Sequence, residues 1–379
     1  MRALTTDPTT LHVGGAAPYD VVIGHGVADR LVGLLGAGGR PQRVALILPD
    51  TLAALAAPVR ASLEAEFEVT ELVVPDGESA KTAATAAACW ASLGEAGFTR
   101  SDAVVTFGGG ATTDLGGFVA ATWLRGVRVV HVPTTLLAMV DAAVGGKTGI
   151  NTDAGKNLVG SFHEPAGVLC DLTLLATLPR ADLIAGMGEV VKCGFIADPR
   201  ILELVEGHET DELLDTDGPA LRELVERSVQ VKVDVVVADL KETAGTSGDV
   251  HPGREALNYG HTMGHAIERA EAYRMRHGEA VAIGSVFVAE LARAAGVLSD
   301  ATADRHVSAF GRVGLPTGYS GADFDTLRAA MAVDKKSRGN QLRFVVLHEV
   351  GTPRVLAGPD DAWLRAAYDT MVARAQATA

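Results

Sequence analysis

The first half of the chain alternates short apolar runs, rich in β-branched residues, with segments of helical periodicity. The apolar runs lie at residues 19–24, 43–50, 68–75, 103–110 and 128–135, and the helical patterns lie near residues 51–65, 80–97 and 114–124. Strands of this kind that alternate with helices are typical of an α/β domain with a largely parallel sheet. Such sheets bind ligands in the loops that follow their strands.

Helical periodicity dominates the second half of the chain. The helical segments are residues 180–197, 199–206, 219–241, 258–272, 278–295, 300–313, 323–332 and 361–376. One short strand candidate, residues 342–351, interrupts them. We therefore predict an α/β domain over residues 1–177 and a mostly helical domain over residues 178–379.

Composition excludes several kinds of partner. The net charge of −14 argues against a nucleic-acid surface, and no apolar run reaches the length of a membrane span. The N-terminus lacks the layout of a signal peptide, and Cys89, Cys170 and Cys193 form no CxxC motif, so we expect reduced thiols and a cytoplasmic protein. In so acidic a chain, a cluster of Lys and Arg indicates an anionic ligand.

Residues 254–279 contain three histidines. His261 and His265 are four residues apart and share one face of a helix, and His277 opens a new apolar helix. Such imidazoles can bind zinc, and two histidines with a carboxylate and one open position form a catalytic zinc site. The alternative is a surface helix with solvated histidines.

Two segments that follow strands carry glycines and charges. GGGATTDLGG at residues 108–117 opens a helix, where backbone N–H groups can approach a phosphate. Thr113 stands where the dinucleotide motif GxGxxG has its last glycine, so a plain tight turn is an equal alternative. In PDGESAK, Glu78 and Lys81 follow another strand; the glutamate can accept ribose hydroxyls or simply favour a helix N-terminus.

Residues 139–165 hold Asp141, Lys147, Lys156 and Asn157 in glycine-rich sequence that we interpret as loops. Lys147 resembles a phosphate-binding lysine, although the full P-loop spacing is absent and a solvated loop is the alternative.

Glu189 and Lys192 are three residues apart on one helical face. Such a pair is more often a surface salt bridge. Here the flanking Gly, Val and Cys residues indicate burial, where a carboxylate needs a partner such as a metal.

In combination, these segments make the chain similar to the 3-dehydroquinate synthases, members of the sugar-phosphate cyclase family. The resemblance runs from about residue 12 to residue 376. It rests on the motifs PDGE-x-x-K, GGG-x-x-x-D-x-x-G, VPTT, VGGKTGIN, GKN, GE-x-x-K, R-x-x-LNYGHT-x-GHA, HGEAVAIG and DKK. It implies a Rossmann-like NAD-binding domain followed by a helical domain that binds metal and substrate.

The resemblance implies a lyase of the shikimate pathway, which makes aromatic amino acids. The enzyme would convert the keto-acid phosphate DAHP (3-deoxy-D-arabino-heptulosonate 7-phosphate) to 3-dehydroquinate and phosphate. One alcohol is oxidised by NAD, phosphate is eliminated, the ketone is reduced again, and an intramolecular aldol step closes the ring. A divalent metal, zinc or cobalt, holds hydroxyls and polarises the carbonyl.

The resemblance also assigns roles to residues. It places the metal on Glu189, His261 and His277, so that His265 faces the substrate phosphate instead. The other groups implied to act on the substrate are Asp141, Lys147, Asn157, Lys192, Lys232, Glu242, Arg254, Asn258 and one of Lys335 and Lys336. The groups implied to contact NAD are Asp50, Asp76, Gly77, Glu78, Lys81, Gly109, Gly110, Asp114, Thr134, Thr135, Lys147, Lys156, Leu174 and Thr177. Arg125 matches an arginine that can reach a neighbouring subunit's site, so a homodimer is expected.

One departure from the family pattern is an insertion between Glu242 and Arg254. The family separates the two by a very short turn, so the role of Glu242 as a proton acceptor is open. The insertion also leaves open a paralogue, aminodehydroquinate synthase, that acts on an amino analogue of DAHP. Arg254 and Lys232 match the grip on a substrate carboxylate, which argues against the cyclases that act on sedoheptulose phosphate.

Two further classes of protein are alternatives. A metal-dependent NAD alcohol dehydrogenase of the glycerol-dehydrogenase type shares the two-domain build, but it needs no cations for a phosphate, so Lys147, Lys232 and Arg254 weigh against it. A catalytically inactive scaffold protein would not need the intact set of metal and phosphate residues.

Overall fold

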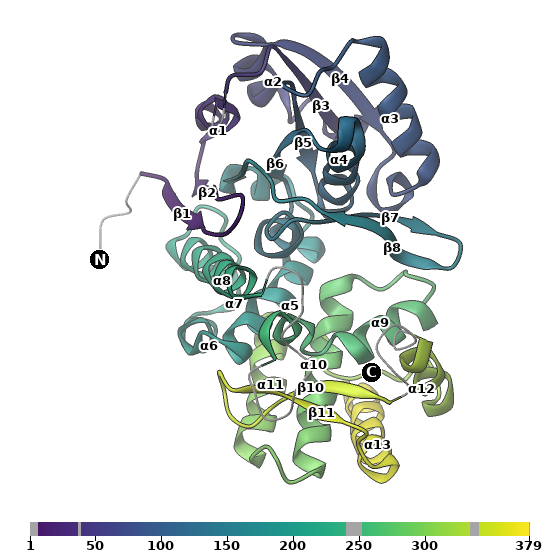
Figure 1. The fold of residues 1–379 in the computed structure, drawn as a ribbon. Coiled ribbons are helices and arrows are strands. Elements are labelled where there is room, and N and C mark those ends of the chain that lie inside the picture. The colour runs from purple at the N-terminus through teal and green to yellow at the C-terminus, as the bar shows by residue number, and fades with distance from the viewer. Residues whose placement is uncertain (1–6, 37–38, 240–251, 334–340, 379) are drawn as a thin grey trace. The chain divides into compact units, whose positions relative to one another are not determined.

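The computed structural model describes residues 7–36, 39–239, 252–333 and 341–378, and it divides into two compact units, Met1–Pro179 and Arg180–Ala379 (Figure 1). The first unit contains a seven-stranded sheet in the order β1-β2-β9-β6-β5-β3-β4. Its strands are β1 (Thr9–Val13), β2 (Tyr19–Gly24), β3 (Arg43–Pro49), β4 (Glu68–Val74), β5 (Ala103–Gly108), β6 (Arg128–Pro133) and β9 (Gly167–Asp171). All neighbouring pairs are parallel except β1 and β2, which confirms the predicted α/β class.

Helices cover both faces of this sheet. The four are α1 (Leu31–Gly36), α2 (Ala57–Glu64), α3 (Ala83–Glu95) and α4 (Gly110–Thr122). Alternate residues of a strand point to opposite faces. In β3, Val44 and Leu46 therefore pack with α1 and α2, whereas Ala45 and Ile47 pack with α3 and α4. Burial on both faces explains why the inner strands β3, β5 and β6 read as almost continuous apolar runs.

The first unit also contains structure that the sequence did not predict. Strands β1 and β9 were missed, although β9 is fully buried and lies between β2 and β6. Residues 139–165 are not loops: they contain a π-helical turn, η5 (Ala138–Ala142), and an antiparallel hairpin of β7 (Lys147–Thr152) and β8 (Gly155–Phe162). Because β8 is largely exposed and rich in polar residues and glycine, it lacks the alternating pattern of a half-buried strand.

The second unit is mostly helical, as predicted. Its elements are α5 (Arg180–Ile196), α6 (Pro199–Gly207), α7 (Thr210–Leu213), α8 (Pro219–Ala238), η8 (Gly253–Asn258), α9 (His261–Ala270), α10 (His277–Ala294), α11 (Asp300–Arg312), α12 (Phe324–Val333) and α13 (Asp361–Thr378). The strand predicted at residues 342–351 is present but shorter, as β10 (Arg343–Leu347). It pairs in an antiparallel hairpin with β11 (Pro353–Ala357), which the sequence did not predict. Within the described part of the chain, no helix combines the length and the apolar character needed to cross a membrane.

Glycines allow the helices of the second unit to touch backbone to backbone. The central helix α10 packs against α5, α9, α11 and α13. A Cβ atom on Gly278 would lie 1.7 Å from the carbonyl oxygen of Ala185 in α5, and one on Gly284 would lie 2.0 Å from the carbonyl oxygen of Gly260. Only glycine fits at such crossings. Gly260 itself has a φ of +77°, which reverses the chain between η8 and α9.

A methyl group at the α5–α10 crossing should destabilise the second unit. We expect Gly278→Ala to cost about 1–3 kcal/mol, because the helices must separate to admit it, and to lower the Tm measured by circular dichroism. Gly311→Ala in α11 is the matched control, since its Cβ would meet no atom within 4 Å. That substitution should leave the Tm unchanged or raise it through helix propensity. Equal Tm values for the two variants would contradict the close crossing.

Candidate functional site

A cluster of possible metal ligands lies within the second unit. Glu189 comes from α5, and His261 and His277 are the first residues of α9 and α10. Ligand atoms of the three residues lie within 4.8 Å of one another. The Nε2 atoms of His261 and His277 are 3.5 and 3.6 Å from Oε1 of Glu189. Ligands about 2.1 Å from a tetrahedral cation lie about 3.4 Å apart, so the cluster has the dimensions of a zinc site.

Hydrogen bonds orient the two imidazoles in this cluster. Nδ1 of His261 lies 3.1 Å from the carbonyl oxygen of Tyr259, and Nδ1 of His277 lies 3.2 Å from Oε2 of Glu268. Each Nδ1–H donates to its acceptor, so each Nε2 is directed toward Glu189, whose Oε1 is buried without a hydrogen-bond partner. A bound cation would give this buried oxygen the partner that it lacks. The sequence motifs did not indicate the roles of Tyr259 and Glu268.

Charge in the cluster is tightly balanced. Burial alone would raise the pKa of Glu189, but the Lys192 ammonium and the two histidines hold that pKa well below its usual value. Burial, and then Lys192, lowers the pKa of His261 to about 3. Burial also disfavours charge on His277, yet the neighbouring carboxylates of Glu189 and Glu268 raise its pKa to about 10. In this cluster His277 holds a proton between the carboxylates of Glu189 and Glu268, and a divalent cation would replace that proton.

A second group of possible ligands shares one residue with the first. His265, Glu268 and His277 also bring their ligand atoms within 4.8 Å of one another. His265 is exposed, and its ring centroid lies 5.3 Å from that of His261 and 6.0 Å from that of His277. Because Glu268 already accepts the His277 Nδ1–H, we favour the first group, and His265 as a neighbour rather than a ligand.

Buried cations lie in the same unit. Lys192 is 1% exposed, pairs with Glu189 and donates to the carbonyl oxygen of Leu257 at 2.7 Å. Lys232 in α8 is buried as well, and α8 packs against α5 and η8. Arg254 lies inside the 3₁₀ helix η8 and is 1% exposed. The predicted burial of Glu189 and Lys192 is confirmed.

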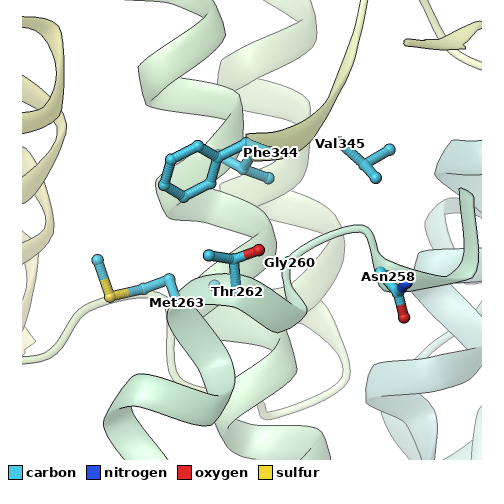
Figure 2. A pocket seen from close by; sticks show the side chains of 8 residues that line it. Asn258, Gly260, Thr262, Met263, Phe344 and Val345 are labelled. Atoms are coloured by element: carbon cyan, nitrogen blue, oxygen red, sulfur yellow. The ribbon is translucent and has the colours of Figure 1, made fainter. Parts of the chain in front are cut away.

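Asn258 ends η8 beside a small pocket at the turn into α9 (Figure 2). The other residues that line the pocket are Gly260, Thr262, Met263, Gly284, Val288, Phe344 and Val345. Figure 2 shows Met263 and Phe344 on one side of the turn and Asn258 on the other. The pocket is too tight for a water molecule, so it is a packing gap rather than a ligand site.

In the first unit, the residues expected to contact NAD gather at one edge of the sheet. They follow the carboxyl ends of β3 (Asp50), β4 (Asp76, Gly77 and Glu78), β5 (Gly109 and Gly110), β6 (Thr134 and Thr135) and β9 (Leu174 and Thr177). Parallel strands bring their carboxyl ends to the same edge, and the strand order reverses between β3 and β5. Ligands of open α/β sheets bind at such a switch point, where the N-terminus of α4 also favours an anion.

A hydrogen-bond network joins this edge to the β7–β8 hairpin. Lys81, 2% exposed, donates to Asp114 at 2.6 Å and also to Asn157. Asn151, which the sequence analysis did not single out, donates to Glu78 at 2.8 Å and accepts from the backbone of Asn157 at 3.0 Å. Burial raises the pKa of Asp114 to about 6, against the opposing effect of Lys81.

The hairpin also borders a cavity of about 440 Å³, within the usual size range of ligand pockets. Lys147, Asn157 and Asp114 line it together with apolar and small residues of β7 and β8. Lys156 lies in β8 and Asp141 in η5, while Arg125 is exposed in the 3₁₀ turn Trp123–Arg125 that follows α4. Glu242, Lys335 and Lys336 lie outside the described residues.

Variants of two neighbouring histidines separate the two possible metal groups. We expect purified His261→Ala to lose bound zinc or cobalt in elemental analysis, because it removes one of three protein ligands. His265→Ala should keep the metal. EDTA should abolish activity, and zinc or cobalt should restore it. The reverse pattern, with metal lost only from His265→Ala, would assign the ion to the group of His265, Glu268 and His277.

Comparisons with known proteins cover both units. The family model of the 3-dehydroquinate synthase N-terminal region matches residues 71–185, and that of the 3-dehydroquinate synthase C-terminal region matches residues 186–337. The 3-dehydroquinate synthase of Thermobifida fusca (strain YX) is 56% identical over 365 residues, or 96% of each chain.

Two solved structures share the fold over nearly the whole chain. A 2-deoxy-scyllo-inosose synthase complexed with carbaglucose-6-phosphate, NAD⁺ and Co²⁺ has a TM-score of 0.83 at 25% identity, covering 95% of this chain and 99% of that one. ValA, a 2-epi-5-epi-valiolone synthase from Streptomyces hygroscopicus subsp. jinggangensis 5008 with NAD⁺ and Zn²⁺ bound, has a TM-score of 0.82 at 26% identity, covering 93% and 96%. With both family models matched in succession and more than half of its residues shared with a curated relative, the chain belongs to the 3-dehydroquinate synthase family.

Proposed function

We propose that the chain is a 3-dehydroquinate synthase, which converts DAHP to 3-dehydroquinate and phosphate with NAD and zinc or cobalt as cofactors. The observation that carries the proposal is the ligand cluster of Glu189, His261 and His277 with buried Lys192 and Arg254 in the same unit. A metal site combined with buried cations suits a substrate that has both hydroxyls and anionic groups. The identity of 56% to a 3-dehydroquinate synthase supports the same reaction.

The second unit supplies the groups for metal and carboxylate. When held by Glu189, His261 and His277, a divalent metal would polarise the vicinal hydroxyls and the carbonyl of the substrate. Lys192 is fixed by Glu189 and by Leu257, so its charge needs no rearrangement during the reaction. Arg254 can hold a carboxylate through two parallel hydrogen bonds, with Lys232 as a second cation. Asn258 and His265 are proposed contacts of the substrate and its phosphate.

The first unit supplies the groups for NAD and phosphate. NAD would take up one hydride and return it within each turnover. Backbone N–H groups at Gly109 and Gly110 suit the pyrophosphate, and Glu78, held by Asn151, suits the ribose hydroxyls. Lys147 and Asn157 line the cavity of about 440 Å³, where they can hold the substrate phosphate.

Turnover with catalytic amounts of NAD tests this function. With enzyme stripped of NAD and given less than one equivalent, we expect many molecules of phosphate to be released from DAHP for each NAD added. No net NADH should accumulate, because the hydride returns to the intermediate. Phosphate is measured by a coupled assay, and the product is identified as 3-dehydroquinate by mass.

Parallel substrates distinguish the related activities. The amino analogue of DAHP and sedoheptulose 7-phosphate should release phosphate more slowly than DAHP. The Arg254→Lys variant should bind DAHP about tenfold more weakly, because lysine cannot copy the bidentate contact. Preference for the amino analogue would identify the paralogous reaction, and net NADH formation would identify an alcohol dehydrogenase.

We further propose that the enzyme is a homodimer in which Arg125 reaches the partner's site. Leu124, Arg125 and Gly126 have φ values of +49°, +67° and +118°. Two successive non-glycine residues in the left-handed region cost about 1–3 kcal/mol each, and such strain is typical of functional positions. The turn keeps Arg125 exposed next to Leu124, which is 41% exposed. An exposed arginine beside an apolar side chain suits a contact between subunits.

Mixing two inactive variants tests whether Arg125 of one subunit completes the site of the other. Arg125→Ala and Lys147→Ala should each form inactive homodimers. After subunit exchange, mixed dimers should regain one complete site, giving about a quarter of the parental activity for random pairing of a symmetric dimer. Sedimentation equilibrium should give the mass of two chains. A mixture that stays inactive although mixed dimers have formed would place Arg125 in the site of its own chain.

A further inference from the structure

A buried histidine outside the ligand cluster makes two directed hydrogen bonds. His306 in α11 has no exposed surface. Its Nδ1 lies 2.7 Å from the carbonyl oxygen of Thr302, and its Nε2 lies 2.8 Å from the hydroxyl of Tyr259. A carbonyl oxygen only accepts, so Nδ1 carries the hydrogen. Burial lowers the pKa of His306 to about 3, so the ring is neutral and its Nε2 accepts the Tyr259 hydroxyl proton.

Tyr259 connects this histidine to the ligand cluster. Its side chain is fully buried, and its backbone lies at the turn between η8 and α9. The carbonyl oxygen of the same residue accepts Nδ1–H of His261 at 3.1 Å. That contact decides which nitrogen of His261 is directed toward Glu189. The orientation of Tyr259 therefore bears on the orientation of His261.

His306 also contacts the helix that carries Glu189. Its ring stacks on Phe195 of α5, with ring centroids 3.6 Å apart and an angle of 13° between the planes. Phe195 is fully buried and follows Glu189 and Lys192 on the same helix. One imidazole thus touches both α5 and Tyr259, the segments that bring Glu189 and His261 together.

We infer that His306 is a positioning residue for the metal centre: its hydrogen bond to Tyr259 fixes the Tyr259 carbonyl that orients His261. The inference rests on the proposed metal site. A residue that served only for packing would need the stack on Phe195 but not the directed hydrogen bond to Tyr259. The inference therefore goes beyond packing. The partners that orient metal ligands typically change metal affinity by about 10–100-fold when they are mutated.

Cobalt binding by the full-length protein separates positioning from packing. His306→Phe keeps the aromatic stack and removes the hydrogen bond, and Tyr259→Phe removes the same bond from the other side. We expect each variant to bind Co²⁺ about tenfold more weakly than the parent, at the lower end of the range for such partners. Affinity is measured by competition with a chelator, and the d–d absorption bands of bound cobalt should shift because the angle of one imidazole changes.

The double variant His306→Phe/Tyr259→Phe controls for stability. Replacing both partners of a buried hydrogen bond by apolar groups can be nearly neutral, whereas replacing one leaves a polar group unsatisfied. The Tm of the metal-free double variant should therefore approach that of the parent, while its cobalt affinity and spectrum stay altered. Tyr368→Phe is a matched control, because it removes the hydroxyl that donates to Ala322 at 3.0 Å without contact to the cluster; its cobalt binding should be unchanged.

Two results would overturn the inference while leaving the metal site intact. The first is parental cobalt affinity and spectrum in both single variants. The second is a double variant whose cobalt affinity and spectrum return to those of the parent together with its Tm. That result would make His306 a packing residue. Failure of the parent protein to bind cobalt would instead reject the proposed metal site itself.

Discussion

Contact between helix backbones at glycines is the interaction on which the metal-ligand cluster depends. Each ligand has a glycine as its direct neighbour in the chain: Gly188 precedes Glu189, Gly260 precedes His261, and Gly278 follows His277. A Cβ on Gly188 would lie 2.4 Å from the carbonyl oxygen of Gly278, so the first and third ligands flank one crossing of α5 and α10. Interiors packed this closely leave little freedom to the atoms beside the contact.

The first unit positions its polar groups in a different way. Lys81 is buried between Asp114 and Asn157, and an ammonium so removed from water is tolerated only with well-placed partners. Its partners come from α4 and from the hairpin, so the network holds together segments that are distant in the sequence. Asn157 adopts a φ of +56°, a conformation that asparagine tolerates better than most residues. In the first unit, directed polar contacts thus hold the site residues in position, as contacts between helix backbones do in the second unit.

Periodicity predicted the elements that are long or apolar, and it failed where tertiary contacts decide. Strands β3, β5 and β6 were found because each is an almost continuous apolar run, and β4 because it is rich in valine, whereas β9 is short and begins with glycine. The spacing of His261 and His265 would pair them as ligands. The residues alone marked His277 and Glu189 as candidates, but only the family resemblance selected them over His265. The Tyr259 carbonyl and Glu268 were not predicted because a sequence does not reveal which acceptor an imidazole N–H will meet.

The β7–β8 hairpin replaces the helix that usually connects neighbouring parallel strands. Strands β6 and β9 pair directly, at Val130 with Gly167 and at His131 with Val168, and the whole excursion between them lies outside the sheet. Lengthening such an excursion is inexpensive, since each doubling of a loop adds only about 0.6 kcal/mol of closure entropy. The hairpin can therefore be lengthened while the strand order is kept, provided that Asn157 still accepts from Lys81. The hairpin could therefore be exchanged as a unit on an unchanged sheet, to build a cyclase for a substrate of a different size.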